Sequence, residues 1–131
     1  MLCWLTKEEV LAMHSLQITH FGGSSGIRDQ GLLESALARA QNIATYAEST
    51  PSLARLAAAY GAGIVRNHAF VDGNKRTGLV AAFVFVERSG WRVIASQEEA
   101  YLTFYDLAVG NLSEDELRHW LEANITPAAE S

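Results

Sequence analysis

The sequence contains only one cysteine, Cys3, in 131 residues. A single cysteine cannot form a disulfide bond within the chain, so a reducing cytoplasm is the expected location. We interpret a lone cysteine so close to the N-terminus as a small core residue and not as a nucleophile.

Long apolar runs and an excess of positive charge are also absent. The best apolar stretch, Leu79 to Val86, is far too short to span a membrane, and no cationic segment precedes an apolar run as it would in a signal peptide. Lysine and arginine number 10 against 15 aspartate and glutamate, which gives a net charge of −5. We therefore expect no direct contact with nucleic acid and none with a membrane.

The chain also lacks internal repeats, low-complexity tracts and interdomain linkers. What it has is a hydrophobic content of 49%, which suits one globular domain with a proper core and is too high for a disordered chain. We predict a single domain over residues 1–131, in which residues 126–131 have little to bury and form a frayed tail.

Signals for the start of a helix recur along the chain. Three of them are capping boxes, in which serine or threonine is followed three residues later by glutamate. The others are an aspartate that can cap a helix and a proline suited to a first helical turn. These positions are Thr6, Asp29, Pro51, Ser96 and Ser113. Apolar residues at helical spacing follow them, which predicts a helix after each.

A further helix is expected from about Asn74 to Ser89, and it is apolar on nearly all sides. Such a helix should be buried at the centre of the domain. Residues 41–49 are polar and mixed without a clear period, which predicts a loop or a short hairpin, and Trp91–Ile94 should be extended. The predicted fold class is therefore all-α, a compact bundle of about six helices around a central buried helix.

The densest group of reactive side chains lies where this central helix begins. Ten residues combine a histidine, a carboxylate, a glycine, an amide and two cations in the run His68-Ala69-Phe70-Val71-Asp72-Gly73-Asn74-Lys75-Arg76-Thr77. A helix N-terminus presents unpaired N–H groups and a partial positive charge to phosphate oxygens. The pattern is typical of a site that binds a polyphosphate and moves a proton beside it.

Each charged side chain of this run has a role that follows from its chemistry. His68 can accept a proton near neutral pH and is the candidate general base. Asp72 is a hard oxygen ligand, suited to a Mg²⁺ ion that shares its coordination shell with phosphates. Lys75 contributes a mobile point charge, and Arg76 a planar fork that grips two oxygens. The predicted phosphate contacts are Gly73, Asn74, Lys75, Arg76 and Thr77.

Some of these residues also have a purely structural interpretation. Asp72 or Asn74 could cap the following helix, and Thr77 could serve only in packing. Phe70 is expected to be a buried anchor for the loop. Elsewhere, the pair Arg28-Asp29 is expected to form an ion pair and a helix cap.

The run HxFxDGNKRT resembles the signature of the Fic/Doc superfamily, and within it the death-on-curing (Doc) branch. The Fic branch has HPFxxGNGR followed by a second arginine, whereas this chain has Lys75 in place of the glycine and Leu79 in place of that arginine. The stretch 22–36 and the lead-in Arg66-Asn67 are also similar to the Doc branch, so the resemblance extends over roughly residues 4–124.

The resemblance implies a toxin of a toxin–antitoxin pair that acts as a protein kinase. ATP with Mg²⁺ would bind the motif, and His68 would take a proton from a threonine hydroxyl of translation factor EF-Tu, which would stop translation. The implied partner is an antitoxin whose C-terminal helix covers the active-site groove. Arg66 is implied as a cation that faces the active site, although its position equally suits a solvated charge at a helix C-terminus.

Two other functions remain open from the sequence. Transfer of AMP, the usual Fic activity, would use the same base with attack at the α-phosphorus; Lys75 and Leu79 argue against it. A non-catalytic interaction module would not need the complete set of site residues. The motif alone does not distinguish a kinase from an AMP transferase, and it leaves the oligomeric state open.

Overall fold

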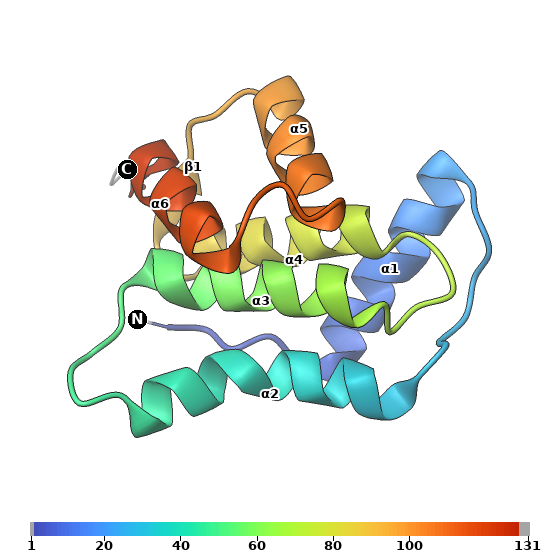
Figure 1. Ribbon diagram of the computed structural model, residues 1–131, viewed down its shortest axis with the longest axis horizontal. Helices are drawn as coiled ribbons and strands as arrows, with labels where there is room; N and C mark the ends of the chain where they lie inside the picture. The colour runs from blue at the N-terminus through green and yellow to red at the C-terminus, as the bar shows by residue number, and fades with distance from the viewer. Residues whose placement is uncertain (1, 129–131) are drawn as a thin grey trace.

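The computed structural model describes residues 2–128, which form six helices and one short two-stranded sheet (Figure 1). The helices are α1 (Lys7–Phe21), α2 (Gln30–Tyr46), α3 (Leu53–Asn67), α4 (Asn74–Arg88), α5 (Gln97–Ala108) and α6 (Glu114–Asn124). Strand β1 (Trp91–Val93) pairs antiparallel with β2 (Ile125–Pro127). The predicted all-α bundle is confirmed. None of the described helices is long and apolar enough to cross a membrane.

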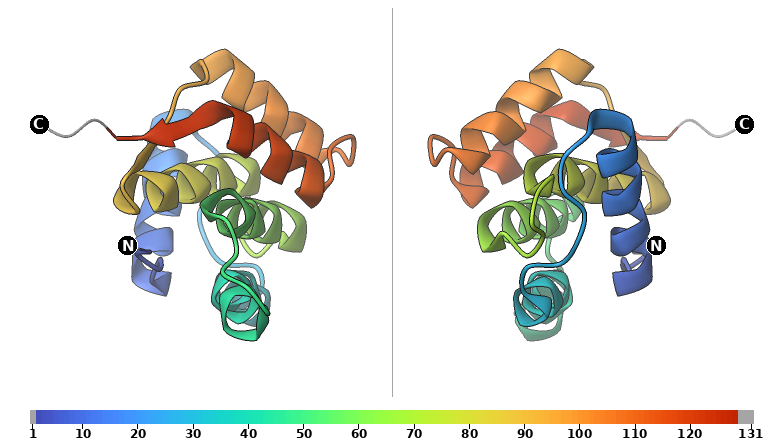
Figure 2. Two further views of the ribbon diagram at one scale, coloured as in Figure 1. Left: turned by 90° about the vertical axis from the view of Figure 1, so that its left-hand side faces the viewer. Right: turned by 90° about the vertical axis from the view of Figure 1, so that its right-hand side faces the viewer.

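The helices form layers on either side of α3 and α4. Figures 1 and 2 show α2 on one side of this pair, α5 and α6 on the opposite side, and α1 against α4. Within the pair the two helices run antiparallel (Figure 1). The loop between them, which carries the motif, therefore lies at one end of the bundle.

Local capping explains where most helices begin. Thr6 and Ser113 form complete capping boxes, and Asp29 accepts a hydrogen bond from the N–H of Leu32. At Ser96 only the serine half of the predicted box is present, with the side chain accepting from the N–H of Glu99. The third helix begins after Ser52, two residues beyond the predicted Thr50-Pro51 start, because the Ser52 hydroxyl accepts from the N–H of Arg55.

The prediction of a loop at residues 41–49 is wrong for most of that segment, because α2 continues to Tyr46. Ile43 and Ala44 are half-buried against the core and continue the inner stripe begun by Leu33 and Ala40. The polar residues between Ala40 and Ile43 are exposed to solvent. Tertiary packing of one side is sufficient to keep a segment helical when its other side is polar.

The sequence predicted α4 as the central buried helix, and this prediction is wrong. The most fully buried helix is α3. Eleven α3 residues are buried, and the helix packs against α2, α4, α5 and α6. Its many alanines and glycines let neighbours approach from several sides. In α4, by contrast, Leu79, Val80 and Phe83 are only half-buried. These apolar side chains pack against the core and also border a surface groove.

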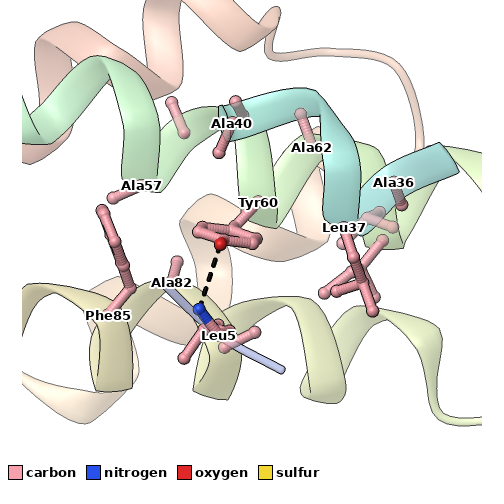
Figure 3. Packing of buried hydrophobic residues seen from close by; sticks show 14 of the residues in the cluster. Leu5, Ala36, Leu37, Ala40, Ala57, Tyr60, Ala62, Ala82 and Phe85 are labelled. Carbon is pink, nitrogen blue, oxygen red and sulfur yellow. Dashed lines mark hydrogen bonds between the residues drawn. The ribbon is translucent and has the colours of Figure 1, made fainter. Parts of the chain in front are cut away.

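The core between α3 and α4 is closed by the N-terminal segment. Figure 3 shows Tyr60 of α3 beside Phe85 of α4, with the Tyr60 hydroxyl accepting a hydrogen bond from the N–H of Leu5 at 3.1 Å. Burial raises the pKa of the Tyr60 phenol above its ordinary value. Trp4 stacks on Phe85, whereas Cys3 is exposed, so the prediction of Cys3 as a core residue is wrong. The side chains that follow it take the core positions.

The predicted frayed tail is also wrong for residues 126–128. Thr126 and Pro127 lie in β2, opposite Arg92 and Trp91, and the N–H of Ala128 donates to the carbonyl of Gly90. The sheet satisfies backbone groups that a tail would leave to solvent. Residues 129–131 of the predicted tail lie outside the described residues.

Gly78 marks a close approach of α4 to α3. A Cβ atom at this position would lie 2.6 Å from Val65 Cγ2 and 3.0 Å from the carbonyl oxygen of Gly61. Because real Cβ contacts are longer than this, only glycine allows the two helices to pack at the observed distance.

We predict that Gly78→Ala lowers the free energy of unfolding by about 1–3 kcal/mol, since the added methyl group must push α4 away from α3. The measurement is urea unfolding followed by circular dichroism. Gly31→Ala is the matched control, because its Cβ would meet nothing closer than 3.4 Å and should raise helix stability slightly. Equal stability of Gly78→Ala and wild type would contradict the packing argument.

Candidate active site at the junction of α3 and α4

The motif forms the turn between α3 and α4. Helix α3 ends at Asn67, and His68 is its C-cap with φ 48° and ψ 48°, the only positive φ among the described non-glycine residues. A left-handed conformation is unfavourable for a side chain with a Cβ, so the surrounding contacts must stabilise it.

Arg28 provides part of that stabilisation. Its guanidinium donates from Nε to the carbonyl of His68 at 2.7 Å and from Nη2 to the carbonyl of Asn67 at 3.2 Å. These are orphan carbonyls at the end of α3, and a cation is favoured there. The predicted helix cap by Asp29 is confirmed, but Arg28 reaches across to the motif and not to its neighbour as an ion pair.

The segment that carries Arg28 also pairs with the motif backbone. The N–H groups of Arg28 and Asp29 both donate to the carbonyl of Ala69, at 2.7 and 3.0 Å, and the N–H of Val71 donates to the carbonyl of Gly26 at 3.1 Å. Ile27 and Phe70 form an isolated antiparallel bridge. These backbone contacts give a physical reason why residues 22–36, the second stretch that resembles the Doc branch, accompany the motif.

Phe70 anchors the loop, as predicted. Its side chain is buried, and its backbone is clamped by Asn74, whose Oδ1 accepts from the N–H of Phe70 and whose Nδ2 donates to its carbonyl, both at 3.0 Å. Both polar atoms of the Asn74 side chain are therefore occupied. Asn74 can still offer its backbone N–H, in the first turn of α4, to a phosphate.

His14 helps to hold the motif loop in place, a role that the sequence analysis did not predict. Its buried ring stacks on Phe70 at 3.8 Å with an interplanar angle of 7°, and its Nε2 lies 2.8 Å from the carbonyl oxygen of Asp72. A carbonyl only accepts, so Nε2 carries the hydrogen. The available signal was a histidine four residues after Val10, on the core-facing side of α1.

Asp72 is exposed, and two backbone N–H groups orient its carboxylate. Oδ1 accepts from the N–H of Gly73 at 2.8 Å, and Oδ2 accepts from the N–H of Ser24 at 3.2 Å. Gly23 must be glycine for this approach, since its φ is +111° and a Cβ there would lie 2.6 Å from Asp72 Oδ2. Each carboxylate oxygen keeps a further lone pair for a ligand.

Helix α4 starts without a side-chain cap. Among the described residues, every other helix has a serine, threonine or aspartate side chain bonded to its first turn, whereas Gly73 is the N-cap of α4. The N–H groups of Asn74, Lys75 and Arg76 have no intrahelical acceptor at this position. An anion is the natural partner for them.

A cavity of about 360 Å³ lies in front of this helix start. It is bordered by six of the predicted site residues, namely His68, Asp72, Gly73, Asn74, Lys75 and Arg76, and by hydrophobic and aromatic residues that include Val71, Tyr105 and Val109. Two predicted residues do not border it. Arg66 donates to the carbonyl of Leu112 at 3.1 Å, and Thr77 is fully buried in α4.

The two cations of the motif rest on aromatic rings. Lys75 Nζ donates to the hydroxyl of Tyr101 at 2.9 Å, and the guanidinium carbon of Arg76 lies 4.4 Å from the ring centroid of Phe21. Arg76 also borders a larger apolar groove of about 720 Å³ between α1, α4 and the start of α5. Aromatic faces attract cations without neutralising them, so both charges remain available to a ligand.

Similar proteins identify the family of this chain. The sequence model of the Fic/DOC family matches residues 4–86. The chain is 38% identical over 109 residues to protein kinase doc of Escherichia phage P1, covering 83% of this chain and 85% of that protein. It is 41% identical over 92 residues to toxin Doc of Mycolicibacterium smegmatis, covering 70% and 68%. With the motif at the uncapped start of α4 and relatives that span most of its length, this chain belongs to the Fic/DOC family.

Proposed function

We propose that this protein is a Doc-type protein kinase, which transfers the terminal phosphate of ATP to a hydroxyl group of a target protein. The observation that carries the proposal is one cavity bordered by His68, by the uncapped start of α4 and by the cations Lys75 and Arg76. A proton acceptor and a phosphate cradle in one cavity are what phosphoryl transfer requires.

Phosphate binding is assigned to the first turn of α4. The free N–H groups and the positive end of the helix dipole attract phosphate oxygens, and Lys75 and Arg76 add two full charges. The relative named protein kinase doc supports ATP as the phosphate donor. Positioning and charge stabilisation by these groups supply most of the rate in phosphoryl transfer.

His68 is assigned as the general base. Its side chain is exposed at the edge of the cavity, and its backbone is held by Arg28. His68 takes the proton of the target hydroxyl while that oxygen bonds to the γ-phosphorus. The bond from the γ-phosphorus to the bridging oxygen breaks, and ADP leaves with the electron pair.

Asp72 fits the role of a ligand for a Mg²⁺ ion bound with the nucleotide. Its carboxylate borders the cavity and has lone pairs left after its two backbone hydrogen bonds. The described residues contain no cluster of three or more His, Cys, Asp or Glu side chains placed to hold a metal. One carboxylate is sufficient when substrate phosphates and water complete the shell. When bound, Mg²⁺ would neutralise phosphate charge.

We further propose that the protein is the toxin of a toxin–antitoxin pair and acts in the cytoplasm. The relative named toxin Doc supports a toxin role. An antitoxin segment that covers the active-site groove would find an apolar surface beside the cavity, bordered by Phe21, Val80 and Phe83. The proposed target is a threonine of EF-Tu, which would couple phosphate transfer to arrest of translation.

The first prediction from the proposed function concerns His68. His68→Ala should reduce phosphate transfer by about 10²–10⁴ and abolish growth arrest, because the proton acceptor is lost. Rates are measured with ATP and a candidate target protein, and His119→Ala, an exposed histidine of α6, is the control. His68→Asn is tested in parallel because asparagine tolerates the left-handed conformation better than alanine. A folded variant of either kind with full toxicity would refute the assignment.

The second prediction concerns Asp72. Asp72→Asn should weaken Mg²⁺-dependent binding of ATP while leaving metal-free binding nearly unchanged, because the amide is a poorer ligand for a hard cation. Calorimetric titration with and without Mg²⁺ measures both. Asp115→Asn, on α6, serves as the control for loss of one charge. Equal affinity of the wild-type protein for ATP with and without Mg²⁺ would exclude this role.

The third prediction separates phosphate transfer from AMP transfer. Lys75 occupies the place at which the Fic signature has glycine, and Leu79 the place of its second arginine. Wild type should therefore pass the label of γ-labelled ATP, and not that of α-labelled ATP, to the target. Lys75→Gly should lose this transfer, since a charge-assisted contact contributes roughly 1.5–3 kcal/mol. Transfer of the α-label by wild type would establish the AMP transferase alternative.

A further inference from the structure

We propose that Tyr101 and Tyr105 of α5 are positioning residues, which hold the ammonium of Lys75 at the edge of the phosphate cavity. The inference rests on the proposed function and extends it to a helix outside residues 4–86, the part that the family model matches. Neither tyrosine belongs to the motif.

The geometry places Lys75 against both rings. Its Nζ is 2.9 Å from the Tyr101 hydroxyl oxygen, 4.4 Å from the centroid of the Tyr101 ring and 5.2 Å from the centroid of the Tyr105 ring. The tyrosines are four residues apart and so share one face of α5. Both distances to the rings lie within the range of a cation–π interaction.

These contacts leave Lys75 free to bind a phosphate. A lysine ammonium has three N–H donors, and the Tyr101 hydroxyl takes one of them. The aromatic faces attract the ammonium through its charge and leave the other two N–H groups for a phosphate. Without such contacts the four-carbon side chain of lysine samples many conformations. Holding it in place before the nucleotide arrives reduces the ordering cost of binding.

The position of the two tyrosines is consistent with this role. Tyr105 borders the cavity together with Lys75 and His68, whereas Tyr101 borders the adjoining apolar groove. Both tyrosines are partly exposed, at 41% and 47%, so neither is needed to fill the core. The hydrogen bond from Lys75 and its charge lower the pKa of the Tyr101 phenol, with a smaller effect of Arg76. The ionisation of Tyr101 therefore reports where the ammonium lies.

The test compares the affinity for ATP of four variants by calorimetry in the presence of Mg²⁺. Tyr101→Phe removes only the hydroxyl, and Tyr105→Leu removes the ring. Each should weaken ATP binding, Tyr101→Phe by roughly threefold to tenfold, which corresponds to the cost of ordering one flexible side chain on binding. Tyr105→Phe keeps the ring and should lose less affinity than Tyr105→Leu. Tyr46→Phe is the matched control, since Tyr46 is 82% exposed at the end of α2.

A double-mutant cycle with Lys75→Met separates positioning from a general structural effect. In the Lys75→Met background, Tyr101→Phe should cause no further loss of ATP affinity, because there is no ammonium to hold. A structural effect would give the same loss in both backgrounds. Spectroscopic titration of the phenols provides a second readout, in which Lys75→Met should raise the pKa of Tyr101.

The outcomes distinguish the inference from the function on which it rests. Tighter or unchanged ATP binding by Tyr101→Phe or Tyr105→Leu, with normal binding by wild type, would overturn the inference and leave the proposed kinase intact. Equal losses with and without Lys75 would overturn it in the same way. Failure of wild type to bind ATP would instead overturn both.

Discussion

The close packing of α3 against α4 is the constraint on which the rest of the molecule depends. Gly78 brings α4 to within contact of Val65 and the backbone of Gly61, and the two helices form the centre around which the others are arranged. Because the helices run antiparallel and touch near the motif, the turn between them must be short and tightly folded. The same contact that builds the core thus determines where the reactive loop lies.

The loop is held by contacts from three directions. Arg28 and its neighbours bond to the carbonyls at the end of α3, His14 bonds to the carbonyl of Asp72, and Asn74 clamps the backbone of Phe70 from inside the motif. Few backbone groups are left to reorganise when a substrate binds. The side chains of His68 and Asp72, by contrast, extend from this rigid frame to the cavity. Such preorganisation is what an active site based on positioning and electrostatics requires.

Aromatic rings hold the cations of the site without neutralising them. Arg76 lies over Phe21 at the end of α1, and Lys75 lies over Tyr101 and Tyr105 of α5. A carboxylate at either place would compete with a phosphate for the positive charge, whereas a ring competes far less. The uncapped start of α4 follows the same logic, since a capping side chain would occupy N–H groups that a phosphate can use.

Features that depend on a few neighbouring residues were predictable from the sequence. The helix starts at Thr6, Asp29 and Ser113 are of this kind, because a cap and its partner lie within three residues. The grouping of His68, Asp72 and Lys75 around one cavity is similar, because a single turn brings them together. Local spacing also predicted the anchoring of Phe70.

Other features were decided only by the tertiary structure. Burial of α3 instead of α4, extension of α2 to Tyr46 and pairing of β2 with β1 all depend on which elements meet. The same holds for His14, which is 58 residues from Asp72, and for Tyr101, which is 26 residues from Lys75. A sequence pattern predicts interactions between residues that are within one or two helical turns of each other. Contacts between distant segments arise only when the packing of the whole core has fixed how those segments approach one another.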